Sequence, residues 1–329
     1  MWRSRRRFAT VAGCVAVVLA ATSAAQAEDT NYPTKPVTII CDAAAGSTPD
    51  VDTRFIAEGL GKRWGQQVIA VDHPGAGGAI GARAAAEAPP DGYTLYMPSL
   101  ATFIAQPGAA PNLPLQLPRD FTAIGFTAAN PMFIAVSPSA GIGTLPELIA
   151  RAKQKPGEVS YATTGVGRLS HLAGELLQMR ADIKLLLVPY SGGPARAVSD
   201  VTNGRVDFII EGYSGIAGAI KSGLLKPIAV ASAERLSDFP DVPTVAETIP
   251  GFAASGWQVM VAPVGTPEPI IQKVSADLRQ VVDDPELKQK LGRLGSYTRH
   301  MTPAEALAFV HAEQNTWRPV LEKIAAKSN

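Results

Sequence analysis

The fold is decided by residues 37–64, whose sequence is VTIICDAAAGSTPDVDTRFIAEGLGKRW. The β-branched run Val37–Cys41 is typical of a buried strand, and the spacing of apolar residues in Val51–Trp64 is typical of a helix. Small residues fill the loop between them. Similar strand and helix patterns alternate along nearly the whole chain, which predicts an α/β fold with mixed, mostly parallel sheets.

Working outward from this unit, the same patterns predict elements up to the C-terminal end. Capping boxes at Thr144–Glu147 and Thr302–Glu305 mark two helix starts. The predicted strands are Val37–Cys41, Val68–Asp72, Thr94–Met97, Phe121–Phe126, Met132–Ser137, Val159–Ala162, Leu185–Pro189, Val206–Ile210, Pro227–Ala233 and Trp257–Ala262. The predicted helices are Val51–Trp64, Ile80–Ala88, Leu145–Lys155, Ser170–Arg180, Ala195–Val201, Ile216–Ser222, one from Pro285 and one over Pro303–Lys323.

At 329 residues, the chain is longer than a single hydrophobic core usually supports, so two lobes are expected. The segment Glu234–Ser255 is rich in Pro, Asp and Ser, which indicates that the chain passes back from the second lobe to the first in this segment. The other crossing is expected near Asn130–Ser137. The prediction is a discontinuous first lobe, residues 28–131 plus 254–329, around a second lobe of residues 132–253.

The N-terminal residues are typical of an export signal. Arg3, Arg5, Arg6 and Arg7 precede the apolar run Phe8–Ala21, and Ala25-Gln26-Ala27 offers a small-x-small cleavage site. Residues 1–27 are therefore predicted to be a signal peptide, of either the Sec or the twin-arginine type. No later apolar run approaches the roughly 18 residues of a membrane span. The mature chain is expected in the periplasm.

Charge and cysteine content exclude several function classes. Residues 1–27 hold four arginines and no acid, which leaves 26 basic and 29 acidic residues, a net charge of −3. No basic surplus favours nucleic acid. Cys41 is then the single cysteine and is expected to be buried in its strand. Neither the histidines nor the cysteines have a metal-ligand spacing, so no metal is predicted.

In the first lobe, loops after strands are candidate binding elements, because ligands of open α/β sheets lie beyond the carboxyl ends of strands. Small residues in the first loop let backbone N–H groups approach an anion, although a plain turn would have the same sequence. A second glycine-rich loop, Pro74–Gly81, does not match the dinucleotide-binding pattern G-x-G-x-x-G, because Ile80 stands where the pattern requires its third glycine. No cofactor is therefore predicted. The candidates from this lobe are Ala44, Ala45, Gly46, Ser47, Asp50, Gly77 and Ser99.

In the second lobe, the candidate residues include two charges of opposite sign. Arg168 presents a planar guanidinium suited to a carboxylate, or it lies in solvent. Glu211, at a strand end, would bind an amine or hydroxyl, or pair with Arg168, and would repel a second carboxylate. The candidates from this lobe are Thr164, Gly167, Arg168, Tyr190 and Glu211.

No catalytic set emerges from the sequence. Ser170 and His171 are neighbours on a predicted helix, so their side chains point about 100° apart and cannot act as nucleophile and base. His171 is expected to pack or cap. An exported hydrolase therefore stays a lesser alternative, and the chain is predicted not to be an enzyme.

An ordered set of motifs across nearly the whole mature chain resembles the extracytoplasmic solute receptors of the tripartite tricarboxylate transporter class, the Bug family. These motifs are Tyr32-Pro33, Lys35–Thr38, Pro74–Gly78, Pro89–Leu95, Ser170–Glu175, Val188–Tyr190, Asp241–Glu247 and Ala262–Pro267.

This resemblance implies a two-lobed, hinged periplasmic-binding-protein fold of the Venus-flytrap, type II-like kind. It also implies a small carboxylate as ligand, held by the loops Ala43–Thr48 and Tyr161–Arg168, with no catalysis. The expected partners are membrane permease subunits or a sensor kinase, and the chain is expected to be a monomer.

This sequence departs from the family pattern at its loops. The family usually has Pro-Phe where Asp42-Ala43 stand, Gly-Gly where Gly46-Ser47 stand and Ser or Thr where Arg168 stands. Asp-Asn is usual at Glu211-Gly212, and Asn is usual at Ala79. The departures therefore bear on the ligand and not on the fold.

Overall fold

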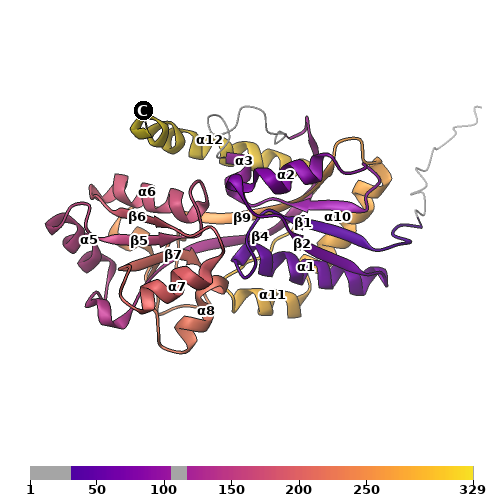
Figure 1. Cartoon of the computed structure of the whole chain (residues 1–329). Helices are drawn as coiled ribbons and strands as arrows, with labels where there is room; N and C mark the ends of the chain where they lie inside the picture. Colours follow the sequence, from indigo (N-terminus) through magenta and orange to yellow (C-terminus); the bar gives the residue numbers. More distant parts are fainter. Residues whose placement is uncertain (1–30, 105–116, 329) are drawn as a thin grey trace, which may run out of the picture.

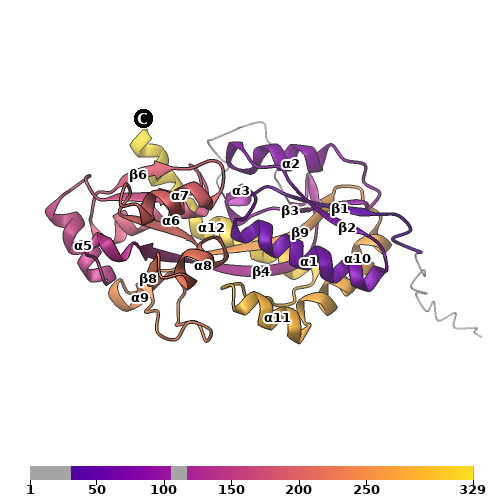
Figure 2. The ribbon, with the colours of Figure 1, turned by 60° about the horizontal axis from the view of Figure 1, so that its bottom comes forward.

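The structure is a computed structural model that describes residues 31–104 and 117–328. The predicted signal peptide lies outside the described residues. Figure 1 shows two bodies, called lobe 1 and lobe 2 below, joined through the middle of the molecule by strands β4 and β9. Figure 2 shows the same two strands passing from one body to the other in a second view.

Lobe 1 is built on a sheet with the strand order β2-β1-β3-β9-β4, in which β1 pairs in parallel with β2 and β3, and β9 pairs antiparallel with β3 and β4. Its strands are β1 (Val37–Cys41), β2 (Val68–Asp72), β3 (Thr94–Met97), β9 (Ser255–Pro263) and the first part of β4 (Phe121–Val136). Its helices are α1 (Thr48–Trp64), η1 (Ala76–Gly78), α2 (Ala79–Ala86), α3 (Leu100–Ile104), α10 (Glu268–Val282) and α11 (Pro285–Gly292).

Lobe 2 is built on the order β8-β4-β7-β5-β6, with β5 parallel to β6 and β7, and β4 antiparallel to β7 and β8. Its other strands are β5 (Ser160–Thr163), β6 (Leu186–Pro189), β7 (Phe208–Gly212) and β8 (Lys226–Val230). Its helices are η2 (Pro138–Ala140), α5 (Leu145–Gln154), α6 (Leu169–Ala181), α7 (Pro194–Thr202), α8 (Tyr213–Lys221) and α9 (Val245–Thr248).

Strand β4 corrects one prediction, because the two strands expected at Phe121–Phe126 and Met132–Ser137 are a single strand. Residues Phe121–Pro131 of β4 pair with β9, and Met132–Val136 pair with β7. Pro131 has no N–H to donate. It is accommodated because it lies where β4 exchanges one partner strand for another. The strand therefore crosses between the lobes without a loop, and the predicted lobe boundaries stay a prediction.

The predicted helix starts are present. Thr302 Oγ1 accepts from Glu305 N at 3.3 Å, and Glu305 Oε2 accepts from Thr302 N at 2.8 Å, so both halves of the capping box are made. At Thr144, the side chain caps Glu147 N, but Glu147 Oε2 accepts from Gly143 N instead. Helix α12 (Pro303–Ser328) packs on β4, α3 and α6, and so contacts elements of both lobes (Figure 1).

The alternating pattern predicts the buried faces well. Cys41 is fully buried in β1, as expected from its place after a β-branched run. Phe126 of β4 and Trp257 of β9 are buried where the two crossing strands meet α12. None of the described helices combines the length and apolar character that a membrane-spanning segment requires.

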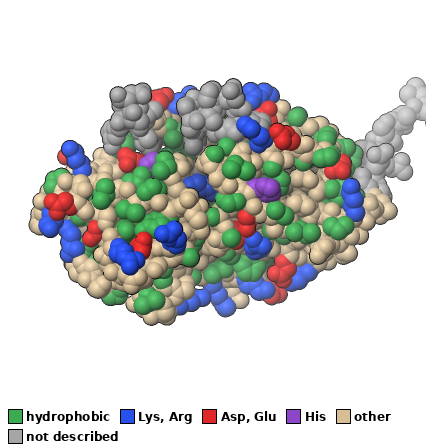
Figure 3. Space-filling model, in the orientation of Figure 1, with side chains coloured by type: hydrophobic (Ala, Val, Ile, Leu, Met, Phe, Trp, Pro, Cys, Tyr) green, Lys and Arg blue, Asp and Glu red, His purple; other side chains and the backbone are tan. Residues whose placement is uncertain are grey.

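Charged side chains of both signs are interspersed with hydrophobic ones over the described part of the face in Figure 3. Within that part of the face, no large area carries a single sign of charge. On this face the molecular surface continues from one lobe to the other, so the two lobes are close together.

Candidate functional site

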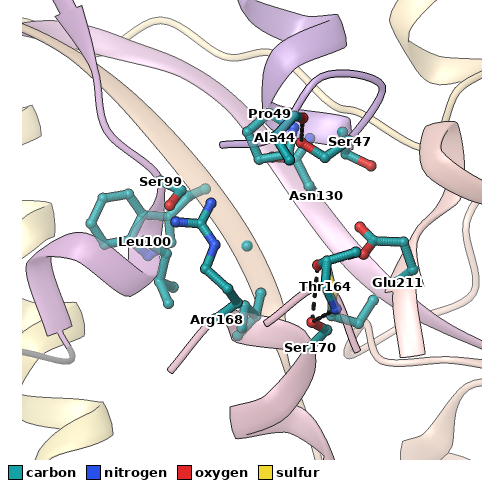
Figure 4. Close-up of a pocket in the computed structure, with 15 residues that line it drawn as sticks. Ala44, Ser47, Pro49, Ser99, Leu100, Asn130, Thr164, Arg168, Ser170 and Glu211 are labelled. Carbon is teal, nitrogen blue, oxygen red and sulfur yellow. Dashed lines mark hydrogen bonds between the residues drawn. The ribbon is translucent and has the colours of Figure 1, made fainter. Parts of the chain in front are cut away.

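A small pocket lies between the lobes, where the carboxyl ends of β1, β5 and β7 converge, and it encloses about 60 Å³. Figure 4 shows residues of both lobes pointing toward the same space. The pocket is lined by Ala44, Ser47, Thr48, Pro49, Ser99, Leu100, Asn130, Met132, Thr164, Arg168, Leu169, Ser170, Glu211, Gly256 and Trp257.

Lobe 1 contributes the loop between β1 and α1. Ser47 is 4% exposed, and its hydroxyl donates to Ala44 O at 2.6 Å, so the hydroxyl oxygen can still accept. The loop turns at Gly46, whose positive φ of 76° favours glycine. Gly46 N donates to Asp50 Oδ2 at 2.8 Å, which ties the loop to the first turn of α1. The loop is therefore held in one shape beside the pocket.

Lobe 2 contributes the loop between β5 and α6. Thr164 N donates to Ser170 Oγ at 3.2 Å, and Thr164 Oγ1 donates to Glu211 Oε2 at 2.8 Å. Gly167 N donates to His171 Nδ1 at 3.2 Å, so His171 caps this loop and is buried, which confirms its predicted structural role. Burial lowers the pKa of His171. Its Nδ1 atom accepts this hydrogen bond and is therefore occupied in a structural contact.

Arg168 extends from lobe 2 across the cleft to lobe 1. Its Nη2 atom lies 3.6 Å from Asp42 Oδ1, and its Nη1 donates to Asp42 O at 3.5 Å. The Arg168 side chain is 15% exposed and that of Asp42 is fully buried. Figure 4 shows the guanidinium beside Ser99 and Leu100 at the pocket. The ion pair of Arg168 is thus with Asp42, a partner that the sequence did not suggest, and not with Glu211, the partner that the sequence left open.

Asp42 is held by further donors from its own lobe. Its carboxylate accepts from Tyr96 Oη at 3.0 Å, from Ser99 N at 3.3 Å and from the Thr102 hydroxyl. A buried carboxylate with several donors is an anchored charge, and Arg168 is the partner that reaches it from the other lobe. Asp42 therefore fixes where the guanidinium lies.

Glu211 lies at the end of β7 on the opposite side of the pocket from Ser99 (Figure 4) and is 4% exposed. Its Oε1 atom accepts from Gly212 N at 2.9 Å, and its Oε2 accepts from Thr164. The pKa of Glu211 lies above its ordinary value because of burial, and hydrogen bonds from Thr164 and Gly212 and the charge of Arg168 oppose this effect only in part. The pocket thus contains a carboxylate that faces its interior.

The lobes also touch directly. Ser214 Oγ, from α8, donates to Thr48 Oγ1, from α1, at 2.6 Å. A Cβ atom added to Gly193 would lie 2.9 Å from Ala45 O, and one added to Gly212 would overlap Thr48 Oγ1. The glycines therefore let backbone from lobe 2 approach lobe 1 closely, and the structure is a closed arrangement of the two lobes.

The structure brings half of the predicted site residues together. Ala44, Ser47, Ser99, Thr164, Arg168 and Glu211 line the pocket. Ala45 and Gly46 are exposed, Gly77 lies in η1 and Gly167 N donates to His171. Asp50 pairs with Arg54 at 2.6 Å, and Tyr190 Oη donates to Asp200 at 2.7 Å. These six residues lie outside the pocket lining.

Sequence reasoning missed pocket residues that come from the crossing strands and from α3. Leu100, Asn130, Met132, Gly256 and Trp257 lie far apart in the sequence and meet only in the fold. One signal was available, because the sequence predicts a crossing between the lobes near Asn130–Ser137, and ligands often bind between domains. Within the described residues, no group of three or more His, Cys, Asp or Glu side chains is placed to hold a metal ion.

Three comparisons place this architecture among known proteins. A family model described as "Tripartite tricarboxylate transporter family receptor" matches residues 53–326. BugT of Bordetella pertussis is 32% identical over 299 residues, which cover 90% of this chain and 91% of BugT. A relative in the ttuE-ttuC' intergenic region of Agrobacterium vitis is 36% identical over 318 residues, with 94% of this chain and 89% of the relative covered.

Solved structures with the same fold include three of similar sequence. An R. palustris protein solved with adipate has a TM-score of 0.84 and 27% identity, over 88% of this chain and 97% of its own. The periplasmic binding protein BugD has a TM-score of 0.81 and 31% identity, over 89% and 98%. MatC from Rhodopseudomonas palustris, with bound malate, has a TM-score of 0.79 and 28% identity, over 88% and 100%. The fold is therefore a two-lobed periplasmic-binding-protein fold.

Proposed function

Because this chain belongs to the tripartite tricarboxylate transporter family of receptors, we propose that it binds a small carboxylate between its two lobes and delivers it to membrane permease subunits. Delivery takes place in the periplasm, after export directed by residues 1–27. The protein binds its ligand without changing it chemically.

The observation that carries this proposal is the pocket between the lobes, to which both lobes contribute polar side chains. Arg168 supplies a guanidinium there, a group that binds carboxylates through charge-assisted hydrogen bonds. Ser47, Thr164 and Ser170 add hydroxyl groups from both lobes. The solved relatives that hold adipate and malate support the same ligand class.

Lobe closure gives the proposal a mechanism. Contacts such as Ser214 to Thr48 and Arg168 to Asp42 join the lobes only when they are close. A ligand that touches both lobes adds contacts that exist only in this closed arrangement. It therefore shifts the population toward the closed form, which is the form a partner in the membrane can distinguish.

The ligand class is tested by a thermal-shift panel on the purified protein. The panel contains mono-, di- and tricarboxylates, acidic amino acids, aromatic acids and nicotinate-like compounds. A ligand at 100 times its Kd adds about 2.7 kcal/mol of stability and raises Tm. The bound acid is expected to be recovered chemically unchanged. If no acid of any class raised Tm, the proposal would be contradicted, and conversion of a bound acid would support a hydrolase instead.

Arg168→Ala is expected to weaken binding of the tightest acid in that panel at least about tenfold, because a hydrogen bond to a charged group is lost. Arg168→Lys keeps the charge but not the planar fork, so its loss is expected to be intermediate. Arg235→Ala, which removes an exposed ion pair with Glu247 outside the pocket, is the matched control. Calorimetric titration measures all three. Wild-type affinity in Arg168→Ala would remove Arg168 from the site.

A further inference from the structure

Among the described residues, two carboxylates and one guanidinium lie at the cleft, and this balance limits the ligands it can accept. Asp42 lies 3.6 Å from Arg168, and its side chain is fully buried. The positive charge of Arg168 is therefore already balanced by Asp42 before any ligand enters. An incoming carboxylate can still accept hydrogen bonds from the guanidinium, but it meets no surplus of positive charge.

Glu211 adds a second negative group to the pocket wall. Each of its two oxygens accepts a hydrogen bond, one from Thr164 and the other from Gly212. Among the described residues, no ion pair joins Glu211 to a cation at salt-bridge distance. The side chain lines the pocket, so a ligand group can reach its remaining lone pairs.

From this arrangement we infer that the cleft selects a monocarboxylate that carries its own hydrogen-bond donor, an ammonium or a hydroxyl, which binds Glu211. This inference rests on the proposed function. The ligand carboxylate is placed at Arg168 and the donor at Glu211, so each pole of the ligand meets a group of opposite character. An ammonium or hydroxyl that donates to a buried carboxylate makes a charge-assisted hydrogen bond.

A dicarboxylate is disfavoured by the same groups. Its second carboxylate would lie near Glu211 with no described cation to balance it. Like charges at close range in a poorly solvated site repel each other, and neither is hydrated well enough to compensate. Glu211 is thus a specificity-determining residue that rejects a second carboxylate and retains a donor.

Five four-carbon acids separate these possibilities in calorimetric titrations at neutral pH: butyrate, α-hydroxybutyrate, α-aminobutyrate, γ-aminobutyrate and succinate. They share chain length and differ in the group that would meet Glu211. We expect at least one donor-bearing acid to bind about tenfold or more tightly than both butyrate and succinate. The amino and hydroxyl acids then distinguish an ammonium from a neutral donor.

Glu211→Gln removes the charge and keeps the shape of the side chain. In this variant, the advantage of the best donor-bearing acid over butyrate is expected to fall about tenfold, and succinate is expected to bind more tightly than it does to the wild type. Glu158→Gln is the matched control, because Glu158 is exposed in lobe 2 and lies outside the pocket. Its affinities should equal those of the wild type.

Two results would overturn the inference. One is tighter binding of succinate than of every donor-bearing acid by the wild type, which would leave the proposed carboxylate receptor intact. The other is an unchanged order of affinities for the five acids in Glu211→Gln, which would show that Glu211 does not determine which ligand is preferred. If none of these acids bound and the wider panel was also flat, the proposed function and the inference would both fail.

Discussion

Gly212→Ala is expected to weaken binding of the tightest acid of the panel by up to about 100-fold, with little loss of folding stability. Gly212 has φ −62° and ψ 146°, which alanine adopts freely. Its new Cβ would overlap Thr48 Oγ1 and lie 2.8 Å from Thr48 Cβ, across the cleft. Overpacking of this kind is destabilising by about 1–3 kcal/mol, and here it destabilises only the closed arrangement, because the overlap exists only when the lobes are in contact.

Calorimetry measures the affinity, and small-angle X-ray scattering with saturating acid measures whether the lobes still close. The matched control is Gly218→Ala, because an added Cβ at Gly218 meets no atom within 4 Å. Thr48→Gly in the Gly212→Ala background removes the opposing side chain and should recover part of the affinity. Wild-type affinity in Gly212→Ala would mean that ligand binding does not need the lobe contact seen here.

Asp52→Asn is expected to stabilise the protein increasingly as the pH rises from about 4 to about 7. Asp52 is fully buried in α1, and burial raises its pKa from 3.8 to about 7, against the lowering effect of hydrogen bonds from Ser296 and Asn130. Asn130 Nδ2 donates to Asp52 Oδ2 at 2.6 Å, while Asp52 Oδ1 has no hydrogen-bond partner in the described structure.

The folded protein holds the Asp52 proton more tightly than the unfolded chain, so this group favours folding most below about pH 4. The contribution is lost as the pH rises through about 7. The rise in the pKa of Asp52 from 3.8 to about 7 corresponds to about 4 kcal/mol, and Asp52→Asn removes this contribution from the pH dependence of the free energy of unfolding.

Denaturant unfolding at several pH values between 4 and 8 tests this prediction. The quantity compared is the change with pH in the free energy of unfolding, since the amide also alters local hydrogen bonds at every pH. Asp241→Asn, at an exposed position, is the control for loss of an aspartate and should follow the wild type. Parallel curves for Asp52→Asn and the wild type would contradict the prediction.

The fold could be predicted in detail from local patterns. The strands at Val37–Cys41, Val68–Asp72 and Thr94–Met97 have the predicted bounds, because short β-branched and apolar runs flanked by turn residues favour strands. The exceptions are β4, which was predicted as two strands, and the helices α3, α9 and α10, which were not predicted. A proline interrupts a hydrogen-bond ladder only if its N–H is needed, and that depends on partner strands far away in the sequence.

The site could be predicted only where it follows a strand directly. Thr164, Arg168 and Glu211 were found because they lie just past β5 or at the end of β7. Asn130 and Trp257 were not found, since they enter the pocket from strands that cross between lobes. Asp42 was noted only as a departure from the family pattern. Its role depends on the reach of Arg168 from the other lobe, which no local spacing encodes.

The place of β9 in its sheet has a consequence for biosynthesis. Proteins are made from the N-terminus, and β9 lies between β3 and β4 although it is the last strand of the described chain. Every described strand of lobe 2 has been synthesised once the chain reaches Val230. The sheet of lobe 1 lacks β9 until the chain reaches Pro263. The strands of lobe 2 are therefore all synthesised before the last strand of lobe 1. Until β9 is synthesised, the edges of β3 and β4 that face each other lack the strand that pairs with both, and unpaired strand edges are prone to association with other chains.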